Sequence, residues 1–353
     1  MTVRSRRQVL ASLSMAAAAV PLLGFSSAHS LTPDKEPKVL LPPRLKRNDT
    51  VGLICPAGAA FSKETVQITI ETLEALGLKV KLGRHVFDRF GYLAGTDQAR
   101  AEDVNAMFAD KGVQGILAIH GGWGCARLLP LLDYKTIQRN PKPLIGYSDI
   151  TSLLVAITAK TGLVTFHGPV GAATWNKFSA DFFTKVLFDG EAVLFENPKE
   201  IGDNLTIVKD RITTITPGTA RGRLVGGNLT VLSSIIGSDY LPHWKDAILF
   251  LEDINENVYK IDRMLTQLKL AGVLDEVKGV VFGKCSDCDP GSGSYGSLTL
   301  EEVLEQHLQP LKVPVYSGAM IGHITHKFTI PVGAMAEINA ANGTIQLLNG
   351  VVV

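Results

Sequence analysis

The sequence predicts an α/β protein, in which a doubly wound parallel sheet is followed by a smaller β-rich part. Two features of the chain lead to this prediction. Between about residues 51 and 187, short apolar runs typical of strands alternate with segments of helical periodicity, the order that builds a parallel sheet covered on both faces. After about residue 191, β-branched runs dominate, and one clear amphipathic helix at residues 258–270 interrupts them.

The elements of the first half follow from local patterns. Apolar or alternating runs predict strands at residues 50–55, 78–82, 113–119 and 143–146. Apolar residues recurring on one face predict helices at residues 62–76, 98–111, 126–132 and 151–160. Ser62 and Thr65 are capping candidates for the first of these helices. Because ligands of parallel sheets bind beyond the carboxyl ends of the strands, we expect the loops at residues 56–58, 120–124 and 146–149 to lie close together.

The second half is expected to contain mostly strands, at residues 205–208, 211–215, 222–229, 247–251, 279–282 and within 334–353. We therefore predict an α/β domain at residues 48–190 and a β-rich C-terminal domain at residues 206–353. A segment rich in proline, lysine and arginine, residues 31–47, is predicted to be a linker that precedes the first domain.

Composition excludes some classes of protein. The chain has 353 residues, of which 46% are hydrophobic and 20% charged, as is ordinary for a globular protein. Its formal net charge of +1 argues against a nucleic-acid partner, since no basic excess is present to neutralise phosphates. The body of the chain has no run of about eighteen uncharged apolar residues, so we expect no membrane span there.

The N-terminus differs from the rest of the chain and predicts an export signal. An arginine-rich start at residues 4–7 precedes an apolar stretch at residues 9–25, and the small residues 26–28 suit a signal peptidase. The letters SRRQVL around the paired arginines resemble a twin-arginine signal, which exports folded proteins. We expect residues 1–30 to be a signal peptide and the mature protein to be periplasmic; an uncleaved N-terminal anchor is the alternative.

Ser148 is a candidate nucleophile because it lies between a predicted strand and a predicted helix. Gly146 permits a tight turn, and a serine at such a turn projects its hydroxyl from the sheet edge, as in the nucleophile elbow of hydrolases. The following helix N-terminus would stabilise negative charge. The hydrolase pattern G-x-S-x-G is not met, and helix capping by Ser148 or Asp149 is the alternative interpretation.

The loop HGGWG, residues 120–124, follows a predicted buried strand. Its glycines allow backbone amides to approach a ligand closely, and together with the amide after the nucleophile they suit an oxyanion hole. A phosphate cradle is the alternative, but neither a P-loop lysine nor GxGxxG spacing is present.

Glu252 and Asp253 end a buried apolar run, a position from which a strand delivers polar side chains to a cleft. Helix capping before residues 255–259 is an equally good interpretation. His323 lies in a loop before residues 329–331, and His326 and His167 compete with it for the role of a base.

Four cysteines follow the predicted signal. Cys285 and Cys288 have the spacing of a metal or redox pair, but a metal site would need two further ligands nearby, and Cys55 and Cys125 are distant in sequence. We therefore expect free cysteines with at most one local disulfide, and no metal.

Together these segments resemble the LD-carboxypeptidase family of serine peptidases. Seven motifs occur in the order of that family: GYLAGTD at 91–97 with Arg100, HGGWGCAR at 120–127, GYSD at 146–149, GGNL at 226–229, LED at 251–253, IDR at 261–263, and GH at 322–323 with PVG at 331–333. The resemblance runs from about Lys46 to the C-terminus. It implies a flavodoxin-like N-terminal domain and a smaller β-rich C-terminal domain, with the site in the groove between them.

The resemblance also implies roles for individual residues. Ser148 would attack, His323 would take its proton and Glu252 would orient the imidazole. The amides of Gly122 and Asp149 would stabilise the oxyanion. The implied substrate is the murein tetrapeptide, cut between meso-diaminopimelate and the terminal D-alanine without a metal or other cofactor, and family members are commonly homodimers.

Substrate contacts are expected from His120, Gly121 and Trp123, two of which depart from the family pattern. The family usually has arginine where His120 stands and tyrosine where Trp123 stands, and histidine is a weaker, pH-dependent partner for a carboxylate. Two alternatives remain open. One is a peptidase of the microcin-immunity branch that cleaves aminoacyl-nucleotide conjugates, with Trp123 stacking on the base. The other is an inactive periplasmic peptide-binding protein.

Overall fold

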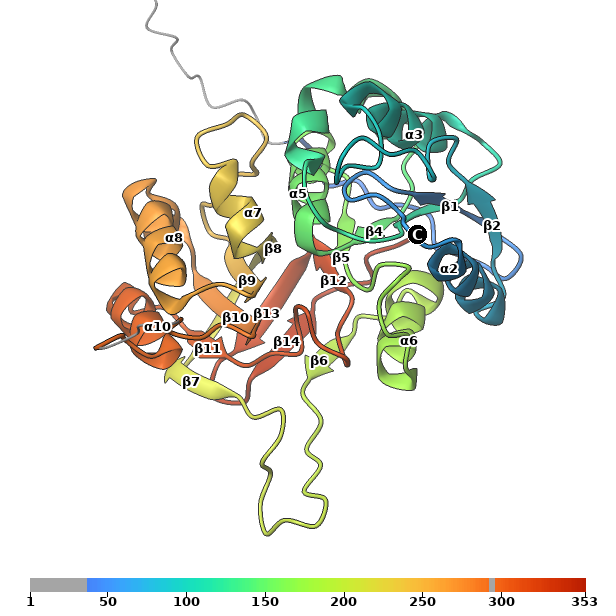
Figure 1. The fold of residues 1–353 in the computed structure, drawn as a ribbon. Helices are drawn as coiled ribbons and strands as arrows, with labels where there is room; N and C mark the ends of the chain where they lie inside the picture. Colours follow the sequence, from blue (N-terminus) through green and yellow to red (C-terminus); the bar gives the residue numbers. More distant parts are fainter. Residues whose placement is uncertain (1–36, 292–295) are drawn as a thin grey trace, which may run out of the picture. The chain divides into compact units, whose positions relative to one another are not determined.

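The described residues of this computed structural model, 37–291 and 296–353, form two β-sheets with helices packed against them (Figure 1). The first sheet has the strand order β12-β5-β4-β3-β1-β2, and the second has the order β6-β14-β13-β8-β9-β10-β11-β7. This arrangement confirms the predicted α/β class. The predicted signal peptide, residues 1–30, lies outside the described residues.

The first sheet is parallel except at one edge. Its strands are β1 (Thr50–Ile54), β2 (Lys79–Leu82), β3 (Gly115–Ala118), β4 (Leu144–Gly146), β5 (Thr165–His167) and β12 (Ile330–Val332). Strands β1 to β5 pair in parallel, as expected for the first half of the chain. Strand β12 is antiparallel to β5, although it comes from the end of the chain that was predicted to build only the second domain.

The helices around this sheet are α2 (Lys63–Ala75), α3 (Asp97–Ala109), α4 (Tyr134–Arg139), α5 (Thr151–Thr161) and α6 (Lys177–Thr184). Ser62 caps α2 as expected, since its side chain accepts a hydrogen bond from the amide of Thr65. The helix expected at residues 126–132 is instead a 3-10 helix, Cys125–Leu131, that contains Pro130. Proline lacks the amide proton that an α-helical turn requires, which explains the difference.

The second sheet is parallel at its centre and antiparallel towards its edges. Its strands are β6 (Leu194–Glu196), β7 (Thr213–Thr216), β8 (Thr219–Asn228), β9 (Ile248–Ile254), β10 (Gly279–Ser286), β11 (Val315–Ser317), β13 (Met335–Asn339) and β14 (Thr344–Leu347). Its helices are α7 (Leu229–Ser234), α8 (Val258–Leu270), α9 (Val273–Glu276) and α10 (Leu300–Leu308). Of these helices, the sequence indicated only α8.

The strand expected at residues 205–208 is absent from the described structure. Residues 198–211 instead form a segment that projects from the body between β6 and β7 (Figure 1), and Leu205 within it is fully exposed. A β-branched run forms a strand only where a neighbouring strand pairs with it, and this segment has none, so the prediction was wrong.

The chain before β1 packs on the body. The amide of Leu45 donates to the carbonyl of Leu187 at 2.8 Å, and that of Arg44 donates to the carbonyl of Val353 at the same distance. Leu40 also exchanges backbone hydrogen bonds with Gly162 and Val164, so the described part of the predicted linker, residues 37–47, packs along the body. The domain division at residues 48–190 and 206–353 stays a prediction, since the described residues belong to one compact unit.

The two sheets meet at the start of α5. The Thr151 hydroxyl accepts a hydrogen bond from the amide of Asn228 at 3.0 Å, and Thr151 is completely buried. Gly227, at φ 145°, makes this approach possible, because a Cβ there would lie 2.5 Å from the Thr151 methyl carbon. Strand β8 is thus held directly behind the turn that carries Ser148. Among the described residues, no helix combines the length and apolarity needed to cross a membrane.

Candidate active site

Ser148 is held in a strained backbone conformation at the end of β4. Its φ angle is 64°, in the left-handed region that non-glycine residues rarely adopt. Gly146 makes the turn possible, because a Cβ there would lie 2.8 Å from the Ile150 side chain. The start of α5 at Ile150 has no side-chain cap, so Ser148 does not serve as the cap that was considered as an alternative. The strained turn matches the geometry expected of a nucleophile elbow.

Glu252 and His323 form a buried pair. Glu252 ends the buried run of β9 with no exposed surface, and its Oε2 lies 2.8 Å from His323 Nδ1. Gly322, at φ 125°, permits this contact, since a Cβ there would lie 2.9 Å from that same oxygen. In the described structure, Ser148 and His323 line one cavity without a hydrogen bond between them. Such a bond is often long before substrate binds.

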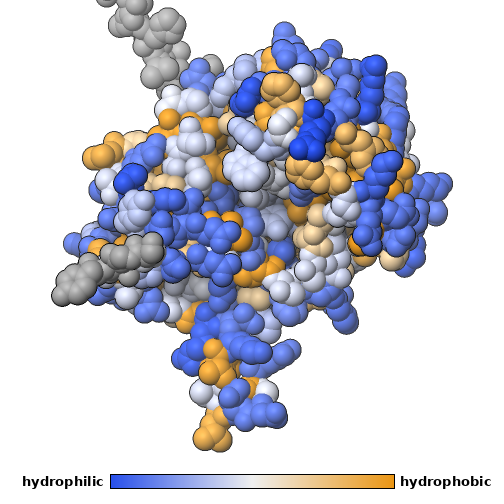
Figure 2. Space-filling view, in the orientation of Figure 1, coloured by the Kyte–Doolittle hydropathy of each residue, from blue (hydrophilic) through white to orange (hydrophobic). Residues whose placement is uncertain are grey.

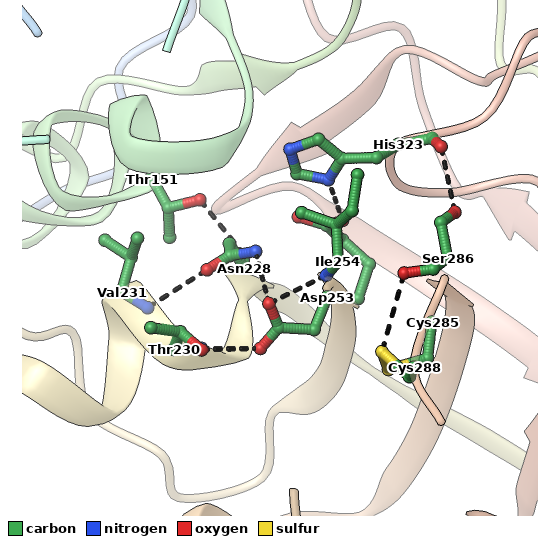
Figure 3. A network of polar contacts seen from close by, with 11 residues as sticks. Thr151, Asn228, Thr230, Val231, Asp253, Ile254, Cys285, Ser286, Cys288 and His323 are labelled. Carbon is green, nitrogen blue, oxygen red and sulfur yellow. Dashed lines mark hydrogen bonds and ion pairs between the residues drawn. A yellow bond between two sulfur atoms is a disulfide. The ribbon is translucent and has the colours of Figure 1, made fainter. Parts of the chain in front are cut away.

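The neighbouring carboxylate, Asp253, has a structural role (Figure 3). It accepts hydrogen bonds from the Asn228 side chain at 3.1 Å, from the amide and hydroxyl of Thr230 at 2.9 Å each, and from the Ile254 amide at 2.9 Å. Burial nevertheless raises the pKa of Asp253 to about 6. Asp253 therefore fastens the turn between β8 and α7, while Glu252 alone faces the imidazole.

The hydroxyl of Ser286 fixes the loop that carries the base. It donates a hydrogen bond to the carbonyl oxygen of His323 at 2.8 Å (Figure 3). The next turn is closed by a disulfide between Cys285 and Cys288, the local bond that the sequence allowed. Cys55 and Cys125 are free and buried, and burial raises the pKa of the Cys55 thiol to about 12, which makes it a poor nucleophile.

The competing histidines do not pair with Glu252. His167 is buried, and among the described residues neither of its ring nitrogens has a hydrogen-bond partner. Burial lowers the pKa of His167 to about 4, so it is neutral at pH 7. His326 is exposed, and its ring lies 5.7 Å from that of Phe178.

The loop at residues 120–124 lies against the nucleophile. A Cβ added at Gly121 would be 2.8 Å from Ser148 Cβ and 3.5 Å from the amide nitrogen of Asp149. Gly122 has φ 128°, and a Cβ on it would meet the backbone of Gly58 at 2.9 Å. The two amides proposed for the oxyanion hole therefore belong to adjacent backbone segments. Asp149 itself turns its side chain away, accepting a hydrogen bond from the Cys125 amide at 2.8 Å.

A buried arginine ties these loops together, and it was not among the predicted site residues. Arg100 donates to the carbonyl of Pro56 at 2.5 Å and to that of Gly124 at 3.1 Å, and it pairs with Asp97 at 2.6 Å. Its side chain is completely buried. The motif at residues 91–97 with Arg100 contained the signal for this role, because an acid and a base three residues apart lie on one helix face.

The cavity around Ser148 has a volume of about 430 Å³ and an aromatic rim. It is lined by the predicted residues His120, Gly121, Gly122, Trp123, Ser148 and His323, and by Phe61, Tyr92 and Tyr147. The Trp123 side chain is 64% exposed, and its ring meets that of Tyr92 edge to face at 5.7 Å. Burial lowers the pKa of His120, which favours the neutral form of that imidazole.

The surface of the molecule is mostly hydrophilic on the face shown in Figure 2, with apolar side chains scattered over it. Another hollow, of about 550 Å³ beside α3 and α4, is lined by no pair of nucleophile and base. Among the described residues, no three His, Cys, Asp or Glu side chains are grouped to hold a metal ion. The cavity around Ser148 is therefore the best-equipped site for hydrolysis.

Comparison with protein families gives two matches along the chain. Residues 51–168 match the model of an LD-carboxypeptidase N-terminal domain, and residues 221–338 match that of an LD-carboxypeptidase C-terminal domain. Ser148 lies in the first matched segment, and Glu252 and His323 lie in the second.

Individual relatives agree with these matches. A probable murein peptide carboxypeptidase of Bacillus subtilis is 38% identical over 88% of this chain and 95% of its own length. The murein tetrapeptide carboxypeptidase of Pseudomonas aeruginosa is 32% identical over 82% and 92%. Among solved structures, the microcin C7 self-immunity protein MccF in complex with glutamyl sulfamoyl guanosine superposes with a TM-score of 0.80 and 28% identity, over 89% of this chain and 100% of that one.

Proposed function

Because the chain belongs to the LD-carboxypeptidase family of serine carboxypeptidases, we propose that it releases the terminal D-alanine from murein tetrapeptide. The bond cleaved joins the L centre of meso-diaminopimelate to D-alanine. One observation carries the proposal: the strained Ser148 and His323, which is bound to the buried Glu252, line the same cavity. Relatives named for murein peptides support this choice of substrate.

The catalytic cycle uses groups of this chain alone. Ser148 Oγ attacks the carbonyl carbon while His323 Nε2 takes the hydroxyl proton, and Glu252 holds the opposite ring nitrogen and balances the imidazolium charge. The amides of Gly122 and Asp149 stabilise the oxyanion. His323 then returns the proton to the leaving amine, and D-alanine departs. Water, activated by His323, hydrolyses the acyl-enzyme and releases the tripeptide.

A panel of peptides tests the substrate. The mature protein should release D-alanine from L-Ala-γ-D-Glu-meso-diaminopimelate-D-Ala. It should leave intact the pentapeptide ending in D-Ala-D-Ala and the tetrapeptide ending in L-alanine, since both present different stereochemistry around the scissile bond. Cleavage of all three peptides at similar rates would contradict LD specificity.

A second candidate substrate rests on the exposed Trp123 beside Tyr92, which could stack on a nucleobase. The neighbouring MccF structure contains a glutamyl sulfamoyl nucleoside. Release of glutamate from such a conjugate, with no action on the tetrapeptide, would favour this branch. An inactive binding protein would instead bind the tetrapeptide in calorimetry without forming product.

We further propose that the protein is exported to the periplasm and acts there as a homodimer. The export proposal rests on the arginine pair and apolar stretch of the N-terminus. Replacing Arg6 and Arg7 by lysine should retain the protein in the cytoplasm, as cell fractionation would detect. The dimer is supported by the exposed apolar side chains of Ile201, Leu205 and Val208 on the projecting segment. Sedimentation of wild type and Leu205→Glu tests it.

A further inference from the structure

Lys327 is a buried lysine close to the proposed triad, and it takes no part in the proposed catalytic cycle. It follows His323 by four residues, and only 4% of its surface is exposed. Among the described residues, its ammonium group forms no hydrogen bond or ion pair, but it lies 5.1 Å from the centre of the Tyr147 ring. The Nζ atom keeps a little contact with solvent, but a lysine with so little exposed surface and no bonded carboxylate loses most of its hydration, which is costly.

The Tyr147 ring connects this ammonium to the base. Its centre lies 4.7 Å from that of the His323 ring, with the two rings at 62°. The same ring lies 6.0 Å from His167, and it belongs to the residue before Ser148. The Tyr147 ring therefore contacts both groups: the Lys327 ammonium lies over it, and the His323 ring meets it edge to face.

Among the described residues, Glu252 is the carboxylate that acts on this cluster of side chains. It acts electrostatically on Lys327, Tyr147 and His167, and all of these side chains are largely buried. One oxygen of Glu252 binds His323, whereas the other has no hydrogen-bond partner among the described residues. His167 is neutral at pH 7 and Tyr147 is protonated, so Lys327 is the cation available to balance the carboxylate.

We propose that Lys327 is a positioning residue for hydrolysis, whose ammonium holds the Tyr147 ring against His323 and balances the buried Glu252 charge. This inference rests on the proposed role of His323 as the base, but it does not depend on the identity of the substrate. Lys327 is not among the residues that line the cavity, so its loss should lower kcat and leave KM nearly unchanged.

The proposal has a signature in pH. Burial lowers the pKa of Lys327 to about 8, although the charge of Glu252 opposes this shift. The positive charge is therefore present below about pH 8 and is lost as the pH rises through that value. If the charge is needed, kcat should fall across the same range.

Two substitutions separate charge from packing. Lys327→Arg keeps a cation at every pH, so it should retain activity and remove the fall in kcat above pH 8. Lys327→Met keeps the length without the charge, and we expect about a tenfold lower kcat at pH 7 with no dependence on pH near 8. Lys142→Met is the matched control, because Lys142 is also buried with a pKa near 8, yet its ammonium binds the carbonyls of Met107 and Asp110 far from the cavity.

The readout is the rate at which a fluorophosphonate probe labels Ser148 in the folded full-length mature protein, measured from pH 6 to pH 9.5 beside D-alanine release. The proposal would be supported by a wild-type rate that falls near pH 8, a Lys327→Arg rate that does not fall there, and a lower Lys327→Met rate that does not depend on pH near 8. Lys142→Met should behave as the wild type does. Equal rates and equal profiles in wild type and folded Lys327→Met would overturn it. Labelling without D-alanine release would refute the murein substrate and still test Lys327; failure to label Ser148 would refute both.

Discussion

The left-handed conformation of Ser148 depends on two glycines nearby, Gly146 and Gly121, which have no Cβ atom. A left-handed serine costs on the order of 1 kcal/mol and persists only where its neighbours enforce it. Gly146 and Gly121 leave the space that this turn occupies, since a Cβ on either would come within 2.8 Å of a neighbouring carbon. The hydroxyl is therefore aimed by the backbone packing, before any hydrogen bond to His323 forms.

Substitution of Gly121 by alanine tests this packing. The backbone of Gly121 is not in the left-handed region, so the only penalty is the collision of the new methyl group with Ser148. We expect kcat/KM to fall about a hundredfold, the effect of displacing a reacting group by about 1 Å. Gly112→Ala, in an exposed turn, is the control and should leave activity unchanged. An active Gly121→Ala enzyme would contradict the arrangement.

The buried His167 makes stability depend on pH. Its pKa of about 4 lies below the ordinary 6.5, so between these values the unfolded chain binds a proton that the folded protein excludes. The contribution of His167 to the free energy of unfolding is fully present above pH 6.5. It falls by roughly 1.4 kcal/mol per pH unit as the pH drops towards 4. His167→Phe should remove this loss of unfolding free energy, which amounts to about 3 kcal/mol between pH 6.5 and pH 4. Urea unfolding at pH 7, 5.5 and 4.5 would measure the difference between the variant and the wild type. An unchanged slope would show that His167 does not titrate in this way.

At the scale of elements, the contact of α5 with β8 brings the halves of the site together. Thr151 accepts the Asn228 amide across this contact, and Asn228 in turn caps α7 and binds Asp253 beside Glu252. The turn that carries the nucleophile and the strand that carries the acid thus share one hydrogen-bond network (Figure 3).

Thr151→Val should loosen this contact. Valine has the same shape but leaves the buried Asn228 amide without an acceptor, which costs about 1–3 kcal/mol. Chemical denaturation should show this loss, accompanied by lower activity. Thr72→Val removes a hydroxyl on the outside of α2 and should change stability by less than about 0.5 kcal/mol. Equal effects of the two substitutions would argue against a special role for the contact.

The sequence predicted elements well where they depend on their own residues. The parallel strands and α2, α3, α5 and α8 have strong local patterns, and they occur close to the expected bounds. Strands β5 and β12 were missed because each is three residues long and gains its stability from its neighbours. Residues 205–208 have strand-like side chains and were predicted to form a strand, but they form none because no partner strand of the described structure lies beside them.

At the scale of the whole molecule, the site is assembled from distant parts of the chain. Ser148 follows a strand of the first sheet, whereas Glu252 lies near the end of β9 in the second. Strand β12, which follows the loop of His323 and Lys327, pairs with β5 of the first sheet. The base and the nucleophile are therefore fixed to the same sheet although they are far apart in sequence.

The same assembly limits what the sequence could indicate about the site. Ser148, His323 and Glu252 were found through motifs, because their turns and strand ends leave local signals. Tyr147 and Lys327 have no such signal as a pair, since the contact between them exists only after β12 pairs with β5. The structural role of Asp253 also could not be separated from that of Glu252 until their side chains were seen to face opposite partners.

The most direct test of the account is the release of free D-alanine from L-Ala-γ-D-Glu-meso-diaminopimelate-D-Ala by wild type, Ser148→Ala and Ser152→Ala. Ser152 lies on α5 and donates its hydroxyl to the Asp149 carbonyl, so its loss controls for removing a nearby serine. We predict release by wild type and Ser152→Ala, and at least a thousandfold slower release by folded Ser148→Ala. Comparable release by Ser148→Ala would contradict the assignment of the nucleophile, and with it the proposed mechanism.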